Sequence, residues 1–142
     1  MKHILLIAFI CILTGNAIAA DRHAKLASLL NQERSNNNQK PLVENAELSK
    51  AAQLHAQDML SNDYLSHTGQ DGSNFFQRIK RQNYRPCYAA ENIAKGQSSA
   101  EQVMRDWMNS KTHRKNNLSA KPDHFGIGVA GNTWVILFGR KC

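Results

Sequence analysis

The sequence predicts an α+β domain in which helices cover a small antiparallel sheet. Apolar residues recur at helical spacing in the segments before residue 110, and strand-like alternation replaces this pattern between residues 125 and 138. Helices followed by strands, without regular alternation of the two, are typical of α+β proteins. The 142 residues are enough for one compact domain and too few for a large two-domain enzyme with a Rossmann half.

The first twenty residues have the pattern of a secretory signal. A short basic start precedes an apolar run from Ile4 to Leu13, and small residues follow up to an A-x-A end at Ala19. We therefore expect residues 1–20 to be removed, and residues 21–142 to form one secreted or periplasmic domain without a transmembrane segment. An uncleaved N-terminal anchor is the alternative, although the apolar run is shorter than the ~20 residues of a membrane span.

Two amphipathic helices are predicted in the first half of the domain. The first runs from Asp21 to a run of asparagines that ends at Asn38, and its apolar stripe consists of Leu26, Leu29 and Leu30. The second begins after Asn45, a residue type that caps helices, and ends near Asn62. Its apolar stripe is spaced by three or four residues and consists of Leu48, Ala52, His55 and Met59.

Two shorter helices are predicted after a polar, turn-rich loop at residues 66–72. The first covers residues 75–81, and the side chains expected to face inward are Phe75, Phe76 and Ile79. Residues 84–98 look irregular, with room for one short strand. Ser99 and Gln102 then form a capping-box pair at the start of a helix that ends near Ser110. The inner face of this helix consists of Val103, Met104 and Trp107.

The C-terminal segment predicts a β-hairpin. Residues 125–129 alternate apolar residues with glycines, and residues 133–138 are rich in residues that favour strands. The dipeptide Gly131-Asn132 between them is a tight-turn signal. Because glycines leave one face of the first strand without side chains, we expect another element to pack closely against that face.

The chain is basic, with 18 Lys and Arg residues, 11 Asp and Glu residues and a net charge of +7. An exported basic protein meets anionic envelope polymers or lipid head groups rather than nucleic acid. The basic residues are scattered along the chain, so we interpret the charge mainly as an aid to solubility. No Gly-rich phosphate loop precedes a helix, which argues against nucleotide chemistry.

Two cysteines, Cys87 and Cys142, remain if Cys11 leaves with the signal. Export makes a disulfide between them chemically reasonable, and it would join the last residue of the chain to the body of the domain. Closing a loop of this size contributes roughly 4 kcal/mol in the chain-entropy model. Two free thiols or a bond between chains are the alternatives.

Three of the five histidines after the signal carry no functional indication. His55 lies on an apolar helical stripe and is interpreted as a packed or hydrogen-bonded core residue, His23 is interpreted as a surface residue, and His124 begins the hairpin. The sequence contains none of the motifs H-E-x-x-H, C-x-x-C and G-x-S-x-G, so no local motif by itself predicts catalysis.

His67 and His113 differ from these, because each lies in a polar segment next to a helix end, where its side chain can reach a shared cleft. Glu91 lies between them in the sequence, beside alanines and an isoleucine, which is not an obvious position for a solvated carboxylate. Two neutral imidazoles can bind zinc and leave coordination positions open, and Glu91 can orient an imidazole, bind the water on the metal or act as general base. Three satisfied polar side chains that join loops to the sheet are the alternative.

Read together, these segments resemble the CAP superfamily of cysteine-rich secretory, antigen 5 and pathogenesis-related proteins, also called SCP-like, in its bacterial branch. The resemblance covers essentially all of residues 22–142. The matching stretches follow the order of the family and are residues 30–34, 48–59, 64–67, 91–94, 107–114, 126–129 and 134–138.

The resemblance implies a three-layer α-β-α sandwich with helices on both faces of the sheet. It also implies a central cleft with two histidines, which match His67 and His113, and two acidic residues, the first of which matches Glu91. The second acid is expected three residues after the tryptophan, where this sequence has Ser110. Mechanisms that need two carboxylates lose support from this departure, whereas metal binding by the two histidines does not.

Two functions fit this cleft. The first is a binding module without enzymatic activity, which holds a divalent metal, zinc first, and whose ligand is a lipid, an envelope polymer or a protein. The alternative is a metal-dependent, protease-like hydrolase in which Glu91 takes a proton from metal-bound water. We favour binding, because catalytic zinc usually has three protein ligands and only two are evident. A third interpretation is a purely structural hydrogen-bond network.

No coiled-coil heptads or exposed apolar stripe indicate a dimer, so we expect a monomer.

Overall fold

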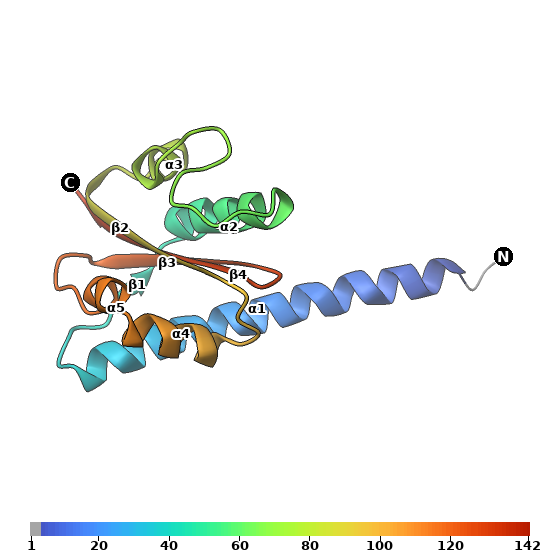
Figure 1. Ribbon diagram of the computed structural model, residues 1–142, viewed down its shortest axis with the longest axis horizontal. Coiled ribbons are helices and arrows are strands. Elements are labelled where there is room, and N and C mark those ends of the chain that lie inside the picture. The colour runs from blue at the N-terminus through green and yellow to red at the C-terminus, as the bar shows by residue number, and fades with distance from the viewer. Residues whose placement is uncertain (1–3) are drawn as a thin grey trace.

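The structure is a computed structural model that describes the backbone of residues 4–142 and the side chains of residues 15–142. It has three layers, with α2 and α3 on one side of a sheet and α1, α4 and α5 on the other (Figure 1). The elements follow in the order α1 (Ile4–Asn36), β1 (Val43–Glu44), α2 (Ala46–Ser61), α3 (Phe75–Arg81), β2 (Pro86–Lys95), α4 (Ala100–Asn109), α5 (Lys111–Asn117), β3 (His124–Ala130) and β4 (Thr133–Lys141). The predicted α+β sandwich is confirmed.

Helix α1 is longer than the first helix predicted from the sequence. It runs without interruption from Ile4 to Asn36, and its N-terminal part extends away from the rest of the domain (Figure 1). The start of the predicted signal segment, residues 1–3, and the side chain of Cys11 lie outside the described residues, and the cleavage of residues 1–20 stays a prediction. None of the helices in the described part of the chain combines the length and apolar content needed to cross a membrane.

The sheet has four strands in the order β1-β3-β4-β2, so β2 forms one edge. The predicted hairpin is confirmed, because β3 pairs antiparallel with β4. Strand β2 also pairs antiparallel with β4, whereas β1 adds a parallel pair of two residues that the sequence did not indicate. The segment expected to be irregular, with one short strand, contains the ten-residue strand β2, which pairs with β4 over its whole length. Its alanines, Glu91 and Asn92 carry little strand propensity, so pairing with β4 rather than local sequence determines this strand.

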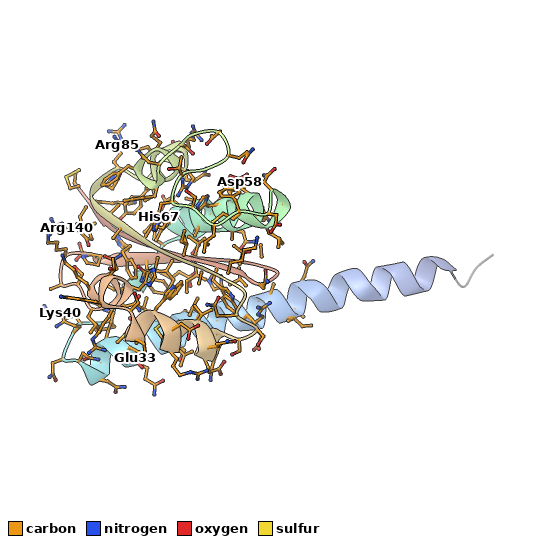
Figure 2. The ribbon with its side chains drawn as sticks, in the orientation of Figure 1. Glu33, Lys40, Asp58, His67, Arg85 and Arg140 are labelled. Carbon is orange, nitrogen blue, oxygen red and sulfur yellow. A yellow bond between two sulfur atoms is a disulfide. The ribbon has the colours of Figure 1, made fainter. Side chains whose placement is uncertain are left out.

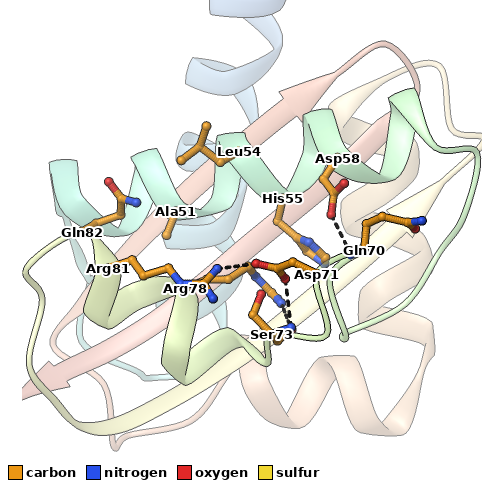
Figure 3. A pocket seen from close by; sticks show the side chains of 10 residues that line it. All are labelled: Ala51, Leu54, His55, Asp58, Gln70, Asp71, Ser73, Arg78, Arg81 and Gln82. Carbon is orange, nitrogen blue, oxygen red and sulfur yellow. Dashed lines mark hydrogen bonds and ion pairs between the residues drawn. The ribbon is translucent and has the colours of Figure 1, made fainter.

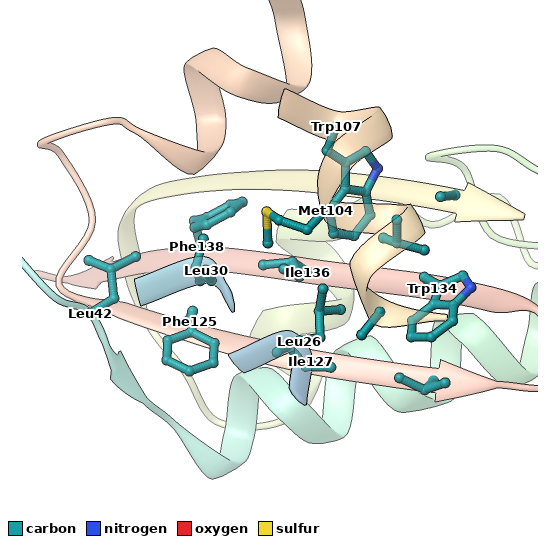
Figure 4. Close-up of a cluster of buried hydrophobic side chains, with 14 residues drawn as sticks. Leu26, Leu30, Leu42, Met104, Trp107, Phe125, Ile127, Trp134, Ile136 and Phe138 are labelled. Carbon is teal, nitrogen blue, oxygen red and sulfur yellow. The ribbon is translucent and has the colours of Figure 1, made fainter. Parts of the chain in front are cut away.

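Both faces of the sheet are buried, which explains the continuous apolar run of β4. Alternate residues of β4 face opposite layers, since Trp134 and Ile136 pack against α1 and α4 whereas Val135 and Leu137 pack against α2. Figure 4 shows the larger of the two cores. Its labelled side chains are Leu26, Leu30, Leu42, Met104, Trp107, Phe125, Ile127, Trp134, Ile136 and Phe138.

The helix starts were predicted from the sequence more accurately than the burial of individual side chains. Asn45 caps α2 and Ser99 caps α4 through their side chains. The side-chain oxygen of Gln102, however, accepts a hydrogen bond from the backbone N–H of Ser98 rather than from that of Ser99. In α3 the prediction for Phe76 is wrong, because this side chain is 37% exposed. Helix α5 was not predicted, since only its last residue, Asn117, is buried and its sequence has no apolar stripe.

The glycine-containing face of β3 packs directly against α2, as predicted. A Cβ atom added to Gly126 would lie 2.2 Å from the backbone carbonyl carbon of Leu48. A Cβ atom added to Gly128 would lie 2.3 Å from the backbone of Ala52. The neighbouring atoms belong to the helix backbone and cannot rotate away, so α2 sits on β3 only because these two positions have no side chain.

Replacing Gly128 with alanine should therefore lower the free energy of unfolding by about 3 kcal/mol, at the upper end for an overpacked core, because α2 must move away from the sheet. Urea denaturation followed by circular dichroism measures this loss. Ser35→Ala is the control, since this exposed residue of α1 lies within residues 21–142 and alanine favours the helix. Equal stability of Gly128→Ala and the parent would show that the contact between α2 and β3 is not tight.

Candidate functional site

The candidate site lies over the free edge of β2, where the two helical layers meet. Glu91 is on this strand, His67 is in the loop between α2 and α3, and His113 is on α5 in the opposite layer. Figure 2 shows the labelled side chains of Asp58 and His67 on the α2 side of the sheet. The fold thus brings the three segments that carry these side chains to one edge of the sheet, with His67 in contact with Glu91 and the backbone of His113 bonded to the neighbouring Asn92.

The carboxylate of Glu91 is the buried centre of the site. Its side chain has no exposed surface, its Oε1 atom lies 2.8 Å from Nδ1 of His67, and its Oε2 atom lies 2.7 Å from Nη2 of Arg78. A carboxylate paired with a guanidinium only accepts hydrogen bonds, so Nδ1 of His67 carries the proton in this contact. The imidazole of His67 is 54% exposed and is oriented by a carboxylate that is inaccessible to solvent.

Arg78 holds the loop that carries His67. Besides its contact with Glu91, its Nη1 atom donates to the carbonyl oxygen of His67 at 3.0 Å and to that of Ser73 at 2.7 Å. This one buried guanidinium therefore fixes the position of His67 through the backbone, while Glu91 fixes the orientation of its ring.

A network of asparagines holds His113. The side chain of Asn92 on β2 donates to the carbonyl oxygen of His113 at 3.0 Å and to Oδ1 of Asn117 at 2.9 Å. Asn116 donates back to Oδ1 of Asn92 at 2.8 Å. The ring of His113 packs near that of Trp107, with the ring centres 6.3 Å apart. Helix α5 is thereby docked on the edge strand without an apolar face of its own.

The two imidazoles are close enough to affect each other electrostatically. Burial lowers the pKa of His113 below its ordinary value, and the nearby imidazole of His67 lowers this pKa further. His113 is therefore neutral at pH 7, which is the protonation state that binds a metal.

The side chains available here as metal ligands are the two imidazoles of His67 and His113, rather than three protein ligands. In the part of the chain that the structure describes, no three side chains of His, Cys, Asp or Glu come together as metal ligands. Both oxygens of Glu91 already accept hydrogen bonds, which supports an orienting role rather than direct ligation. Ser110, at the position of the expected second acid, lies at the junction of α4 and α5 and makes no side-chain cap bond.

Sequence reasoning missed Arg78 and Asn92, whose contacts depend on distant elements. A signal was present for Arg78, because it lies next to the buried Ile79 on the inner face of a short helix. The other histidines lie away from the site or make different contacts. His55 is buried as predicted, His23 pairs with Glu44, and His124 contacts the hydroxyl of Tyr84.

A cavity of about 390 Å³ lies on the other side of Arg78, between α2, α3 and the loop that joins them (Figure 3). Its lining includes Ala51, Leu54, His55, Ser73 and Arg78. The cavity and the His67 site therefore share the guanidinium of Arg78, and their other side chains are different.

Comparison with known proteins identifies relatives over almost the whole domain. The model of the cysteine-rich secretory protein family, CAP, matches residues 27–138. The Bacillus subtilis protein YkwD is 38% identical over 119 residues, which cover 82% of this chain and 46% of YkwD. The chain thus spans less than half the length of this relative.

Two bacterial structures are similar in fold. An extracellular protein of Bacillus anthracis that contains an SCP domain has a TM-score of 0.85 and 30% identity, covering 87% of this chain and 42% of that one. An outer surface protein of Borrelia burgdorferi has a TM-score of 0.76 and 25% identity, covering 82% of this chain and 90% of that one.

Proposed function

Because the chain belongs to the cysteine-rich secretory protein (CAP) family, as its sequence resemblance indicated, we propose that it is a binding module whose cleft holds a divalent metal between His67 and His113. Zinc is the first candidate, since it accepts imidazole ligands and tolerates open coordination positions. The observation that carries this proposal is the buried Glu91 carboxylate, which contacts His67 through Nδ1.

This contact is typical of the outer shell of a metal site. A metal-binding imidazole commonly donates its second ring N–H to a carboxylate, which fixes the ring and raises the basicity of the free nitrogen. With Nδ1 bonded to Glu91, Nε2 is the nitrogen of His67 that remains for a metal. The neutral imidazole of His113 supplies the second nitrogen, and water or a bound molecule completes the coordination.

The alternative function, a metal-dependent hydrolase, has weaker support from the same geometry. Glu91 would have to act as general base, but its two oxygens are engaged by His67 and Arg78. A base must be within hydrogen-bond reach of the water it deprotonates, so this carboxylate would first have to leave one of its partners. We therefore favour binding over hydrolysis, as expected from the two evident ligands.

Two observations support an extracellular or periplasmic place of action. The similar structures include an extracellular protein and an outer surface protein, and the N-terminal sequence has the pattern of a signal. A protein in that place meets lipids, envelope polymers and other proteins. Without Lys2 of the predicted signal the chain has 17 Lys and Arg against 11 Asp and Glu, and this net charge of +6 is compatible with an anionic partner.

Zinc titration of the full chain by calorimetry, with the disulfide formed, tests the metal site. We expect saturable one-to-one binding, weakened by more than about 100-fold in His67→Ala and in His113→Ala, since loss of a direct ligand exceeds the 10–100-fold effect of an outer-shell change. His23→Ala is the matched control, because its imidazole also pairs with a carboxylate, Glu44, but lies outside the cleft. Absence of saturable binding, or binding retained in both folded variants, would leave the three side chains as a structural network.

A further inference from the structure

The cavity between α2 and α3 has three buried polar atoms that lack a hydrogen-bond partner within the described part of the chain. They are Nδ1 of His55, Oγ of Ser73 and Nε of Arg78. The three residues are 1%, 3% and 8% exposed, and their side chains point toward one another beneath α2 (Figure 3). A buried polar group without a partner costs about 1–3 kcal/mol, so three of them around one cavity indicate a polar occupant.

The hydrogen-bonding character of two of these atoms is fixed by their neighbours. Nε2 of His55 lies 2.9 Å from the carbonyl oxygen of Ser66, which can only accept, so Nε2 carries the proton. Burial lowers the pKa of His55, the ring is neutral at pH 7, and Nδ1 is therefore an acceptor. Nε of Arg78 is a donor, and the two terminal nitrogens of this guanidinium already bond to His67, Ser73 and Glu91.

The third atom, Oγ of Ser73, can either donate or accept a hydrogen bond. The hydroxyl of Ser73 lies near the carboxylate of Asp71 and lowers the pKa of this acid, but it makes no hydrogen bond of good geometry with it. A hydroxyl rotates to donate or to accept, so Ser73 can follow whichever group enters. An occupant must then offer a donor to His55 and an acceptor to Arg78.

A secondary amide has this combination, since its N–H donates and its C=O accepts on adjacent atoms. The apolar part of the cavity, formed by Ala51 and Leu54, suits a methyl group next to the amide. The rim adds polar side chains, including Gln70, Gln82 and Arg81, that can hydrogen-bond hydroxyl groups. The volume of about 390 Å³ lies in the range of small-molecule pockets, roughly 300–1,000 Å³.

From this arrangement we propose that the cavity between α2 and α3 binds the acetamido group of an N-acetylated sugar, with the amide N–H on His55, the carbonyl oxygen on Arg78 and the sugar hydroxyls at the rim. The inference deepens the proposed binding function by naming an envelope-polymer component as ligand. It does not require a metal, because none of the atoms that define the cavity belongs to His67 or His113.

Titration of the full ¹⁵N-labelled chain with N-acetylglucosamine, followed by NMR in the presence of EDTA, tests this site. We expect saturable shifts centred on the amides of residues 51–58 and 70–82. Glucose, which has a hydroxyl in place of the acetamido group, should bind at least about 10-fold more weakly, since it lacks the methyl group that contacts the apolar part of the cavity, Ala51 and Leu54.

Matched variants separate binding from folding. Ser73→Ala should weaken binding about 3- to 10-fold, the equivalent of one hydrogen bond. Thr133→Val, which removes another buried hydroxyl without a partner in the described chain, should not. Leu54 is 48% exposed, so Leu54→Trp can narrow the cavity without disturbing the core and should abolish the shifts. Leu60→Trp, on the same helix and 40% exposed, is its control.

Three outcomes would overturn the proposal. Absence of saturable shifts with the sugar would mean that the cavity holds only water. Equal binding of glucose would rule out recognition of the acetamido group. Tighter binding of N-acetyl-alanine methylamide than of the sugar would identify the site as one for a peptide. Since EDTA is present in every titration, failure of the zinc site and failure of this site are distinguishable.

Discussion

Replacing Glu91 with alanine is expected to lower the free energy of unfolding by about 3–5 kcal/mol. The substitution leaves the guanidinium of Arg78, whose side chain is only 9% exposed, without its carboxylate partner at 2.7 Å. An uncompensated buried charge is far more costly than the loss of an exposed ion pair. Urea denaturation of the purified chain, followed by tryptophan fluorescence, measures the change.

An exposed ion pair provides the control for Glu91→Ala. Asp63 contacts Lys95, and its side chain is 94% exposed, so Asp63→Asn should change the free energy of unfolding far less than Glu91→Ala does. Asparagine is chosen because residue 63 has a φ of 49°, which asparagine tolerates better than alanine does. If Glu91→Ala proved as stable as Asp63→Asn, Arg78 would not depend on this carboxylate.

A milder substitution distinguishes the structural and metal-orienting roles of Glu91. Glu91→Gln keeps the shape of the side chain and one acceptor oxygen, so the variant should remain folded at room temperature. If Glu91 orients a metal-binding His67, this variant should bind zinc about 10–100-fold more weakly than the parent. Unchanged zinc affinity in Glu91→Gln would limit Glu91 to supporting the fold.

The features predicted well from the sequence are those in which local pattern and tertiary packing agree. The apolar stripes of α2 and α4 face the two cores, and the glycines of β3 allow α2 to pack closely against this strand. Such patterns can be recognised because the spacing of the apolar residues indicates which face of the element is buried. The sequences of strand β2 and helix α5 have no such spacing. They exist because β2 pairs with β4 and because asparagines dock α5, and both causes lie in other parts of the chain.

The candidate site shows the same division. His67, Glu91 and His113 were identified through residue type and family resemblance, and the structure brings Glu91 into contact with His67. Arg78 was not identified, because its importance depends on the packing of α3 against β2, which buries its guanidinium in contact with Glu91. The cavity beside it was not predicted either, since unpaired atoms on three separate segments leave no pattern in a sequence.

Removal of the disulfide between Cys87 and Cys142 is expected to lower the free energy of unfolding by about 4 kcal/mol in the chain-entropy model. The bridge spans 55 residues of sequence, and without it the unfolded chain gains the freedom of a loop of that length. In the folded domain the bond connects the start of β2 to the end of the chain, where Pro86 is opposite Lys141. Thermal denaturation of Cys87→Ser/Cys142→Ser against the parent measures the loss.

Reduction of the parent provides an independent route to the same state. Both cysteines are exposed, so dithiothreitol should reach the bond in the folded protein and lower the stability of the parent to that of the double variant. The double variant itself should not respond to the reductant, which excludes other effects of dithiothreitol. A loss below about 1 kcal/mol would mean that the pairing of β2 with β4 already holds the C-terminus, and that the unfolded chain gains little freedom when the bond is absent.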